Sequence, residues 1–144
     1  MACSVFCSSA AALLVGLAAH ADESADESEA RSCLQTKAWS HYEDGWALRT
    51  IVTEPISTGA YVSHKVTFYG GRTYKIEACG SDTARQVDLA LYDGAGTVVL
   101  RSTMTGKDPI VDFKPGATTS LFVVAQLREA AAATAEVSVG VFYK

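Results

Sequence analysis

Apolar and polar residues alternate in several stretches between Trp46 and the end of the chain, and this pattern predicts β-strands. Between Tyr61 and Tyr69 every second residue is apolar or histidine, and the residues between are mostly polar. Successive side chains of a strand point to opposite faces, so we expect one buried face and one exposed face. The expected inward side chains are Val62, His64, Val66 and Phe68.

Turn residues divide this region into short strands. Gly70-Gly71 and the segment 93–96 each predict a hairpin, because glycine takes the positive φ that tight turns need. About eight strands, each with one apolar face, predict an all-β chain folded as an antiparallel β-sandwich of jelly-roll type. Residues 129–133 favour a helical turn or a loop equally. The expected strands are 46–52, 61–69, 73–79, 87–91, 98–100, 110–113, 120–127 and 135–143.

The N-terminus has the features of an export signal. Residues 1–21 contain no charged side chain, and the apolar run Ala10 to Ala19 leads into Ala19-His20-Ala21. Small residues at these positions predict a signal peptide over 1–21 that is cleaved before Asp22. The alternative is an uncleaved anchor, but spanning ~30 Å of hydrocarbon takes about 20 apolar residues. We therefore expect a secreted or periplasmic protein without stable membrane insertion.

Two cysteines remain after cleavage, Cys33 and Cys79. Paired thiols are stable in an oxidising compartment, so a disulfide between them is expected. A metal or redox pair would favour Cys-x-x-Cys spacing or nearby histidines, which these widely separated residues lack.

Charge is concentrated just after the predicted cleavage site. Of the 16 acidic residues in the chain, five fall between Asp22 and Glu29. This composition predicts an acidic disordered spacer over residues 22–32, followed by the β-sandwich domain over 33–144. The rest of the chain is nearly neutral, so no nucleic-acid partner is expected.

Two segments carry a family resemblance: Val66-Thr-Phe-Tyr-Gly-Gly-Arg-Thr-Tyr-Lys-Ile-Glu-Ala-Cys79 and Gln86-Val-Asp-Leu-Ala-Leu-Tyr-Asp-Gly-Ala-Gly-Thr-Val-Val99. Over residues 45–143 the chain resembles the bacterial pre-peptidase C-terminal (PPC) domain family. The resemblance implies a non-catalytic jelly-roll module beside secreted peptidases and other exported enzymes, one that binds polymers or Ca²⁺ in some members. Gln86 stands where the family pattern has the first aspartate of a pair, which weakens an inherited metal site.

Acidic side chains offer oxygen ligands of the kind Ca²⁺ prefers. Asp93 precedes a glycine and is better explained as a turn residue. Asp88 lies in the middle of a strand, where aspartate is disfavoured, and is the candidate metal ligand. We expect no cofactor, with Ca²⁺ near Asp88 as the alternative. The acidic set considered is Asp82, Asp88, Asp93 and Asp112.

An aromatic segment precedes the core strands and is the candidate ligand site. Flat rings beside polar groups are typical of sugar and peptide sites, whereas the same rings can also plug one end of a sandwich. The plug is the favoured interpretation. The residues concerned are Trp39, His41, Tyr42 and Trp46.

No catalytic constellation is recognisable. Ser63 and His64 are neighbours on a predicted strand, so their side chains should point to opposite faces. The sequence favours an exported, non-catalytic binding or adhesion module for a polysaccharide or protein surface. The alternative is an accessory subunit that packs beside another secreted protein such as a peptidase. The sequence leaves the oligomeric state open.

Overall fold

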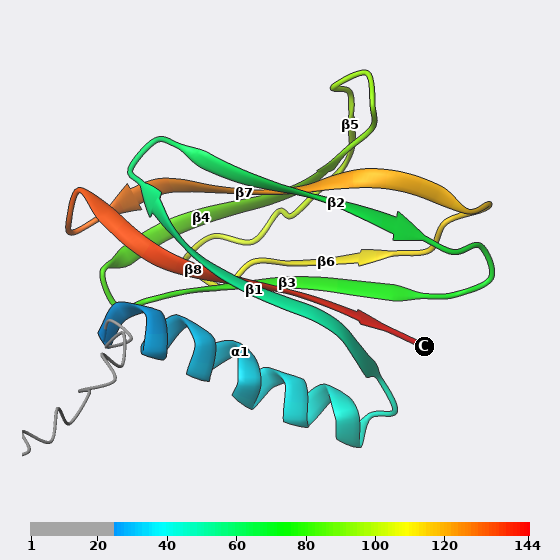
Figure 1. Ribbon diagram of the computed structural model, residues 1–144, viewed down its shortest axis with the longest axis horizontal. Helices are drawn as coiled ribbons and strands as arrows, with labels where there is room; N and C mark the ends of the chain where they lie inside the picture. The colour runs from blue at the N-terminus through cyan, green and yellow to red at the C-terminus, as the bar shows by residue number, and fades with distance from the viewer. Residues whose placement is uncertain (1–24) are drawn as a thin grey trace, which may run out of the picture.

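The computed structural model describes residues 25–144 and contains one helix and eight strands (Figure 1). The predicted signal peptide, residues 1–21, and its cleavage site lie outside the described residues. The elements are α1 (Ala25–Glu43), β1 (Ala47–Ser57), β2 (Tyr61–Phe68), β3 (Tyr74–Gly80), β4 (Ala84–Tyr92), β5 (Val98–Arg101), β6 (Ile110–Phe113), β7 (Thr119–Ala130) and β8 (Thr134–Tyr143).

The strands form two antiparallel four-stranded sheets. Sheet A has the order β1-β8-β3-β6, and sheet B has the order β2-β7-β4-β5. The pairing is nested, because β1 pairs with β8, β2 with β7, β3 with β6 and β4 with β5. The chain thus folds like one long hairpin rolled into two layers. The all-β sandwich predicted from the alternating pattern is confirmed, and the strand of residues 110–113 has the predicted bounds.

One predicted hairpin is wrong. β2 pairs with β7 in sheet B, whereas β3 pairs with β6 and β8 in sheet A, so Gly70-Gly71 carries the chain from one sheet to the other. Gly71 has the positive φ expected of it, 82°. A Cβ on Gly70 would lie 3.1 Å from the backbone of Ala117. Glycine chemistry fixes the turn, but the pairing of the following strand is decided by tertiary packing. The hairpin of β4 and β5 is confirmed.

The main core fills the space between the sheets. The predicted inward face of β2 is confirmed, since Val66 and Phe68 are buried and Val62 packs against the core. The ring centroids of Phe68 and Tyr74 are 4.8 Å apart in an edge-to-face arrangement, which joins sheet B to sheet A. Of residues 129–133, the first two end β7 and residues 131–133 form a bend, so the helical turn is wrong and the loop interpretation holds for 131–133 only.

The disordered spacer predicted over residues 22–32 is wrong from Ala25 on, because α1 begins there. Asp26 and Glu27 in the first turn favour a helix N-terminus, and many of the following residues are good helix formers. The helix ends at Glu43, and Gly45, two residues later, has the positive φ of 82° that a C-terminal cap uses. The amide of Trp46 donates to the carbonyl of His41 at 2.9 Å, which completes a Schellman cap. Within residues 25–144, no helix has the length and apolarity that a membrane span requires.

Helix α1 covers the outer face of sheet A (Figure 1). Leu34 is fully buried in a second apolar cluster with Phe142 and Cys79. A Cβ on Gly140 would lie only 3.0 Å from the Leu34 side chain, so glycine lets the helix approach β8 closely. The predicted disulfide between Cys33 and Cys79 is confirmed, and it ties α1 to β3.

A buried carboxylate also holds the helix. Glu77 on β3 is 4% exposed beneath α1. Its two oxygens each lie 2.6 Å from a helix side chain, one from Lys37 Nζ and one from His41 Nε2. A buried charge is tolerated only when it is paired, so this contact fixes the lysine and the histidine on the inner side of α1.

Removing the disulfide is expected to destabilise the domain strongly. The bridge joins residues 46 apart, and closing such a loop stabilises by about 4 kcal/mol in the chain-entropy model. The double variant Cys33→Ala, Cys79→Ala should therefore unfold at a much lower urea concentration than the wild type. An unchanged midpoint, or free thiols in denatured and unreduced exported protein, would contradict the assigned role.

Partial burial of Glu136 near the acidic first turn of α1 gives a pH-dependent prediction. Burial, followed by the charges of Glu27 and Asp26, raises the pKa of Glu136 above its usual 4.5. A raised pKa means that stability from this group is present below pH 4.5 and is lost as the pH rises through the folded-state value. Glu136→Gln should thus be more stable than the wild type at neutral pH, with the difference shrinking in acid. Urea titrations at neutral pH and below pH 4.5 measure the free energy of unfolding and test this. Glu129→Gln, at an exposed glutamate, is the control. A gain of equal size at both pH values would contradict it.

Candidate functional site

The two outer faces of the sandwich differ. Helix α1 covers sheet A, whereas no element of the described chain covers the outer face of sheet B (Figure 1). The β4–β5 hairpin rises from this open face on the side away from α1. The open face and the hairpin together form the candidate functional site.

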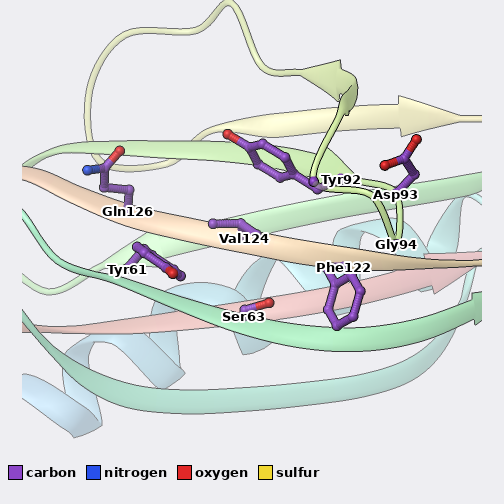
Figure 2. A pocket seen from close by; sticks show the side chains of 9 residues that line it. Tyr61, Ser63, Tyr92, Asp93, Gly94, Phe122, Val124 and Gln126 are labelled. Carbon is purple, nitrogen blue, oxygen red and sulfur yellow. The ribbon is translucent and has the colours of Figure 1, made fainter.

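A hollow of about 530 Å³ lies on this open face. Figure 2 shows its side chains, which come from β2, from β7 and from the end of β4 with the following turn. We call it the sheet-B hollow. Its lining residues are Tyr61, Ser63, Tyr92, Asp93, Gly94, Gly96, Phe122, Val124 and Gln126.

Strand register brings the hollow's side chains into rows. Ser63 lies directly opposite Val124, and Tyr61 lies opposite Gln126. Cross-strand partners on one face have Cβ atoms about 5 Å apart, so these side chains form a continuous surface. The spacing is fixed by the backbone pairing of two long strands, which makes the surface pre-formed.

The wall beside the hollow is held by Asp93. Its carboxylate accepts hydrogen bonds from the amides of Ala95 at 3.0 Å and Thr97 at 2.9 Å. Gly96 completes the turn with a φ of 80°. The turn role predicted for Asp93 is confirmed.

The hollow combines an apolar floor with polar groups at its edge. Phe122 and Val124 are half-buried in the floor, and Tyr61 is 66% exposed beside them. Within residues 25–144, the hydroxyls of Tyr61 and Ser63 have no hydrogen-bond partner, so both can bind a ligand. The amide of Gln126 is held by a 3.1 Å hydrogen bond to the carbonyl of Gly59. Such a surface suits a sugar ring or an apolar peptide side chain.

The structure does not bring the predicted aromatic segment together as one site. Trp39 and Tyr42 lie on the outer side of α1, 71% and 69% exposed, with their ring centroids 6.2 Å apart. His41 points inward, and its ring lies 4.8 Å from that of Phe142. The plug interpretation is therefore wrong for Trp39 and Tyr42, because both rings are largely exposed to solvent. Ligand binding by these exposed rings stays a prediction.

Trp46 belongs to neither group. It is half-buried against the apolar cluster beneath α1. The ammonium groups of Lys75 and Lys144 lie 5.0 and 4.9 Å from the centre of its ring. Both distances allow cation–π attraction. The plug interpretation thus describes Trp46 in part.

Asp88 faces a cation that the protein itself supplies. One carboxylate oxygen accepts a 3.1 Å hydrogen bond from the Gln86 amide, and the other lies 3.6 Å from Arg128 Nε. This pairing accounts for an aspartate within a strand, and a Ca²⁺ ligand role for Asp88 stays a prediction. In the described part of the chain, the only trio of metal-ligating groups is Cys33, Cys79 and Asp108, and its cysteines form the disulfide.

The other aspartates considered from the sequence are also engaged. Asp112 lies 2.7 Å from Lys75 Nζ, and Asp82 lies 2.8 Å from Lys107 Nζ. The hydrogen bond and the charge of Lys107 lower the pKa of Asp82. These carboxylates therefore act as surface ion-pair partners in separate places.

Ser63 and His64 point apart, as the alternation predicts. The Ser63 side chain lines the sheet-B hollow. His64 Nε2 lies 3.0 Å from Glu54 Oε2, although the two atoms are not aligned for a hydrogen bond. The serine and the histidine therefore cannot act as nucleophile and base together.

Sequence reasoning missed the floor of the hollow. From Leu121 to Ala125 every residue is apolar, so the strand has apolar side chains on both faces. Leu121, Val123 and Ala125 fill the core, whereas Phe122 and Val124 lie outside. An unbroken apolar run indicates that both faces of a strand require cover or a partner, and this was the available signal.

The comparisons with known proteins are sparse. No protein-family model and no curated protein sequence matches the chain. Among solved structures, the chain is similar to PliG of Aeromonas hydrophila, a periplasmic inhibitor of g-type lysozyme. The TM-score is 0.47 and the sequence identity is 11%, with 66% of this chain and 83% of that chain covered. At this level the likeness assigns neither a family nor a partner to the chain.

The two tryptophans should respond differently to truncation. Trp39→Ala removes an exposed ring and should leave the free energy of unfolding nearly unchanged. Trp46→Ala removes a half-buried ring and two cation–π contacts, which should cost roughly 1–3 kcal/mol. Chemical denaturation of both variants measures the difference. Equal destabilisation by the two substitutions would contradict the positions assigned to these side chains.

Proposed function

We propose that the chain is an exported, non-catalytic binding module of jelly-roll type that recognises a polymer or protein surface through the sheet-B hollow. The observation that carries the proposal is the unequal cover of the two sheets. On the outer face of sheet A, α1 covers the apolar cluster of Leu34, Cys79 and Phe142, whereas Phe122, Val124 and Tyr61 remain accessible on sheet B. Accessible apolar side chains with polar neighbours on a rigid surface are typical of recognition sites.

Two features support export. The Cys33–Cys79 disulfide belongs in an oxidising compartment. The N-terminal sequence has the apolar run and small residues of a cleavable signal.

The nested strand pairing agrees with the jelly-roll architecture that the PPC resemblance implies. Kinship with that family is part of the proposal.

The size and chemistry of the hollow favour binding over catalysis. A volume of about 530 Å³ falls within the range of roughly 300–1,000 Å³ of small-ligand sites. Its one carboxylate, Asp93, is committed to the turn, and its serine has no base beside it. The free hydroxyls of Tyr61 and Ser63 are suited to orient a ligand above the apolar floor.

An accessory subunit is the second candidate, and the outer side of α1 favours it. Trp39 and Tyr42 form an exposed aromatic pair on a rigid helix. Tryptophan and tyrosine are enriched among residues that dominate protein–protein binding energy. In this alternative, α1 would pack against another secreted protein.

One matched pair of substitutions separates the two candidates. Tyr61 and Tyr42 are the same residue type with nearly equal exposure, 66% and 69%, but they lie on sheet B and on α1. The exported protein is tested for retention on insoluble polysaccharides and on proteins secreted by its native host. Tyr61→Ala should weaken retention about tenfold or more, as expected when a central aromatic contact is lost. Tyr42→Ala should leave retention unchanged.

Thermal unfolding of both variants is the control for folding, because an exposed tyrosine contributes little to stability. Loss of retention in Tyr42→Ala alone would contradict the proposed site and favour the accessory role. Retention that survives both substitutions, together with Phe122→Ala, would overturn the binding function of the sheet-B hollow.

A further inference from the structure

A second hollow, of about 600 Å³, lies at one end of the sandwich. Four strands meet there, since β1 and β3 begin at this end and β2 and β8 finish at it. We call it the arginine cleft, and it shares no lining residue with the sheet-B hollow. Its lining residues are Arg49, Tyr69, Arg72, Tyr74 and Tyr143.

Both arginines of the cleft are held against tyrosine rings. The guanidinium carbon of Arg49 lies 5.5 Å from the ring centre of Tyr69, and that of Arg72 lies 5.1 Å from the ring centre of Tyr143. Arg49 also donates one hydrogen bond to the carbonyl of Thr67. A guanidinium above a ring can still present N–H groups at its edge, so these side chains are positioned with donors to spare.

The charges of the two arginines are not balanced by a carboxylate. Among residues 25–144, neither Arg49 nor Arg72 forms an ion pair, whereas the nearby Lys75 is paired with Asp112 at 2.7 Å. Lys144 follows the end of β8, and its ammonium group lies over the ring of Trp46, outside the cleft. The lining residues of the cleft thus include two guanidinium groups and no carboxylate side chain, on a chain whose net charge is -4.

The back of the cleft is rigid. Tyr74 is 1% exposed, and its hydroxyl accepts a 2.8 Å hydrogen bond from the amide of Tyr69. This bond fixes the segment that carries the ring beneath Arg49. A fixed wall with two positioned guanidinium groups lowers the ordering cost of binding an anion.

We propose that the arginine cleft binds an oxyanion carried by a sugar polymer, namely the carboxylate of a uronic acid or a sulfate ester. Guanidinium N–H groups match the paired oxygens of such anions, and tyrosine rings contact sugar faces and edges. The volume of about 600 Å³ suits small ligand units. Two arginines on a net acidic chain do not make the broad basic surface that nucleic acid requires.

Binding of three polymers to the exported protein, measured by calorimetry at low salt, tests which class of ligand the cleft binds. Polygalacturonate carries carboxylates, dextran sulfate carries sulfate esters, and plain dextran carries neither. We expect binding of at least one charged polymer and none of dextran, with affinity falling as salt is raised. The charged polymer that binds identifies the source of the oxyanion.

Substitution of each arginine by glutamine tests its contribution to polymer binding. Arg49→Gln and Arg72→Gln should each weaken binding about tenfold or more, the loss expected for a charge-assisted hydrogen bond. Arg85→Gln makes the same charge change on an exposed arginine at the start of β4, and it should bind as the wild type. If a glutamine variant fails to fold, Arg49→Lys or Arg72→Lys keeps the positive charge and should still weaken binding, because the planar pair of N–H donors is lost.

The proposal would be overturned if plain dextran bound as tightly as the charged polysaccharides. It would also be overturned if the Arg49, Arg72 and Arg85 variants all bound the charged polymer with the same affinity. Binding of polyglutamate but of neither charged polysaccharide would contradict the sugar-polymer class. Tyr61→Ala should leave binding of the charged polymer unchanged, because the two hollows share no residue. The arginine cleft and the sheet-B hollow can therefore fail independently.

Discussion

The packing of α1 on sheet A is the contact on which the arrangement of this molecule depends. A two-sheet sandwich buries its inner faces by itself, but the outer face of sheet A carries Phe142, Cys79 and the buried Glu77. The helix seals this face through Leu34 over Gly140, through the disulfide from Cys33, and through Lys37 and His41 on the carboxylate. Hydrophobic burial, a covalent bond and a paired charge hold the same element, so its position is determined by three independent kinds of interaction.

Because α1 covers only one of the two sheets, the two outer faces of the domain differ. Sheet B receives no helix within the described chain, yet its outer face includes Phe122 and Val124. The raised hairpin after β4 adds a wall, and Asp93 keeps that wall in place. Recognition by such a surface requires no moving part, because strand pairing sets the positions of the side chains. The arginine cleft, at the end of the sandwich, offers a second kind of surface, in which guanidinium groups at the strand ends lie beside tyrosine rings.

Most of the sandwich could be predicted from sequence, because alternation reports directly on which face of a strand is buried. The segment 22–32 could not, since its acidic composition resembles a spacer and α1 buries little more than Ala30, Leu34 and Ala38 along one side. Its cap at Gly45 was the readable signal. The two hollows escaped prediction because they combine residues distant in sequence. Arg49 and Tyr143, for example, meet only after β1 pairs with β8. The Cys33–Cys79 bridge could be predicted without structural information, because removal of the predicted signal peptide with Cys3 and Cys7 would leave two cysteines and one possible pairing.

The central claim is that sheet B, and not the helix-covered side, is the recognition surface. Amide chemical-shift mapping of the isotope-labelled protein tests it most directly, using whichever polysaccharide or secreted protein retains the wild type. The account predicts shifts confined to β2, β7 and the turn of residues 93–96, with α1 unaffected. Shifts concentrated on the outer side of α1, around Trp39 and Tyr42, would contradict it.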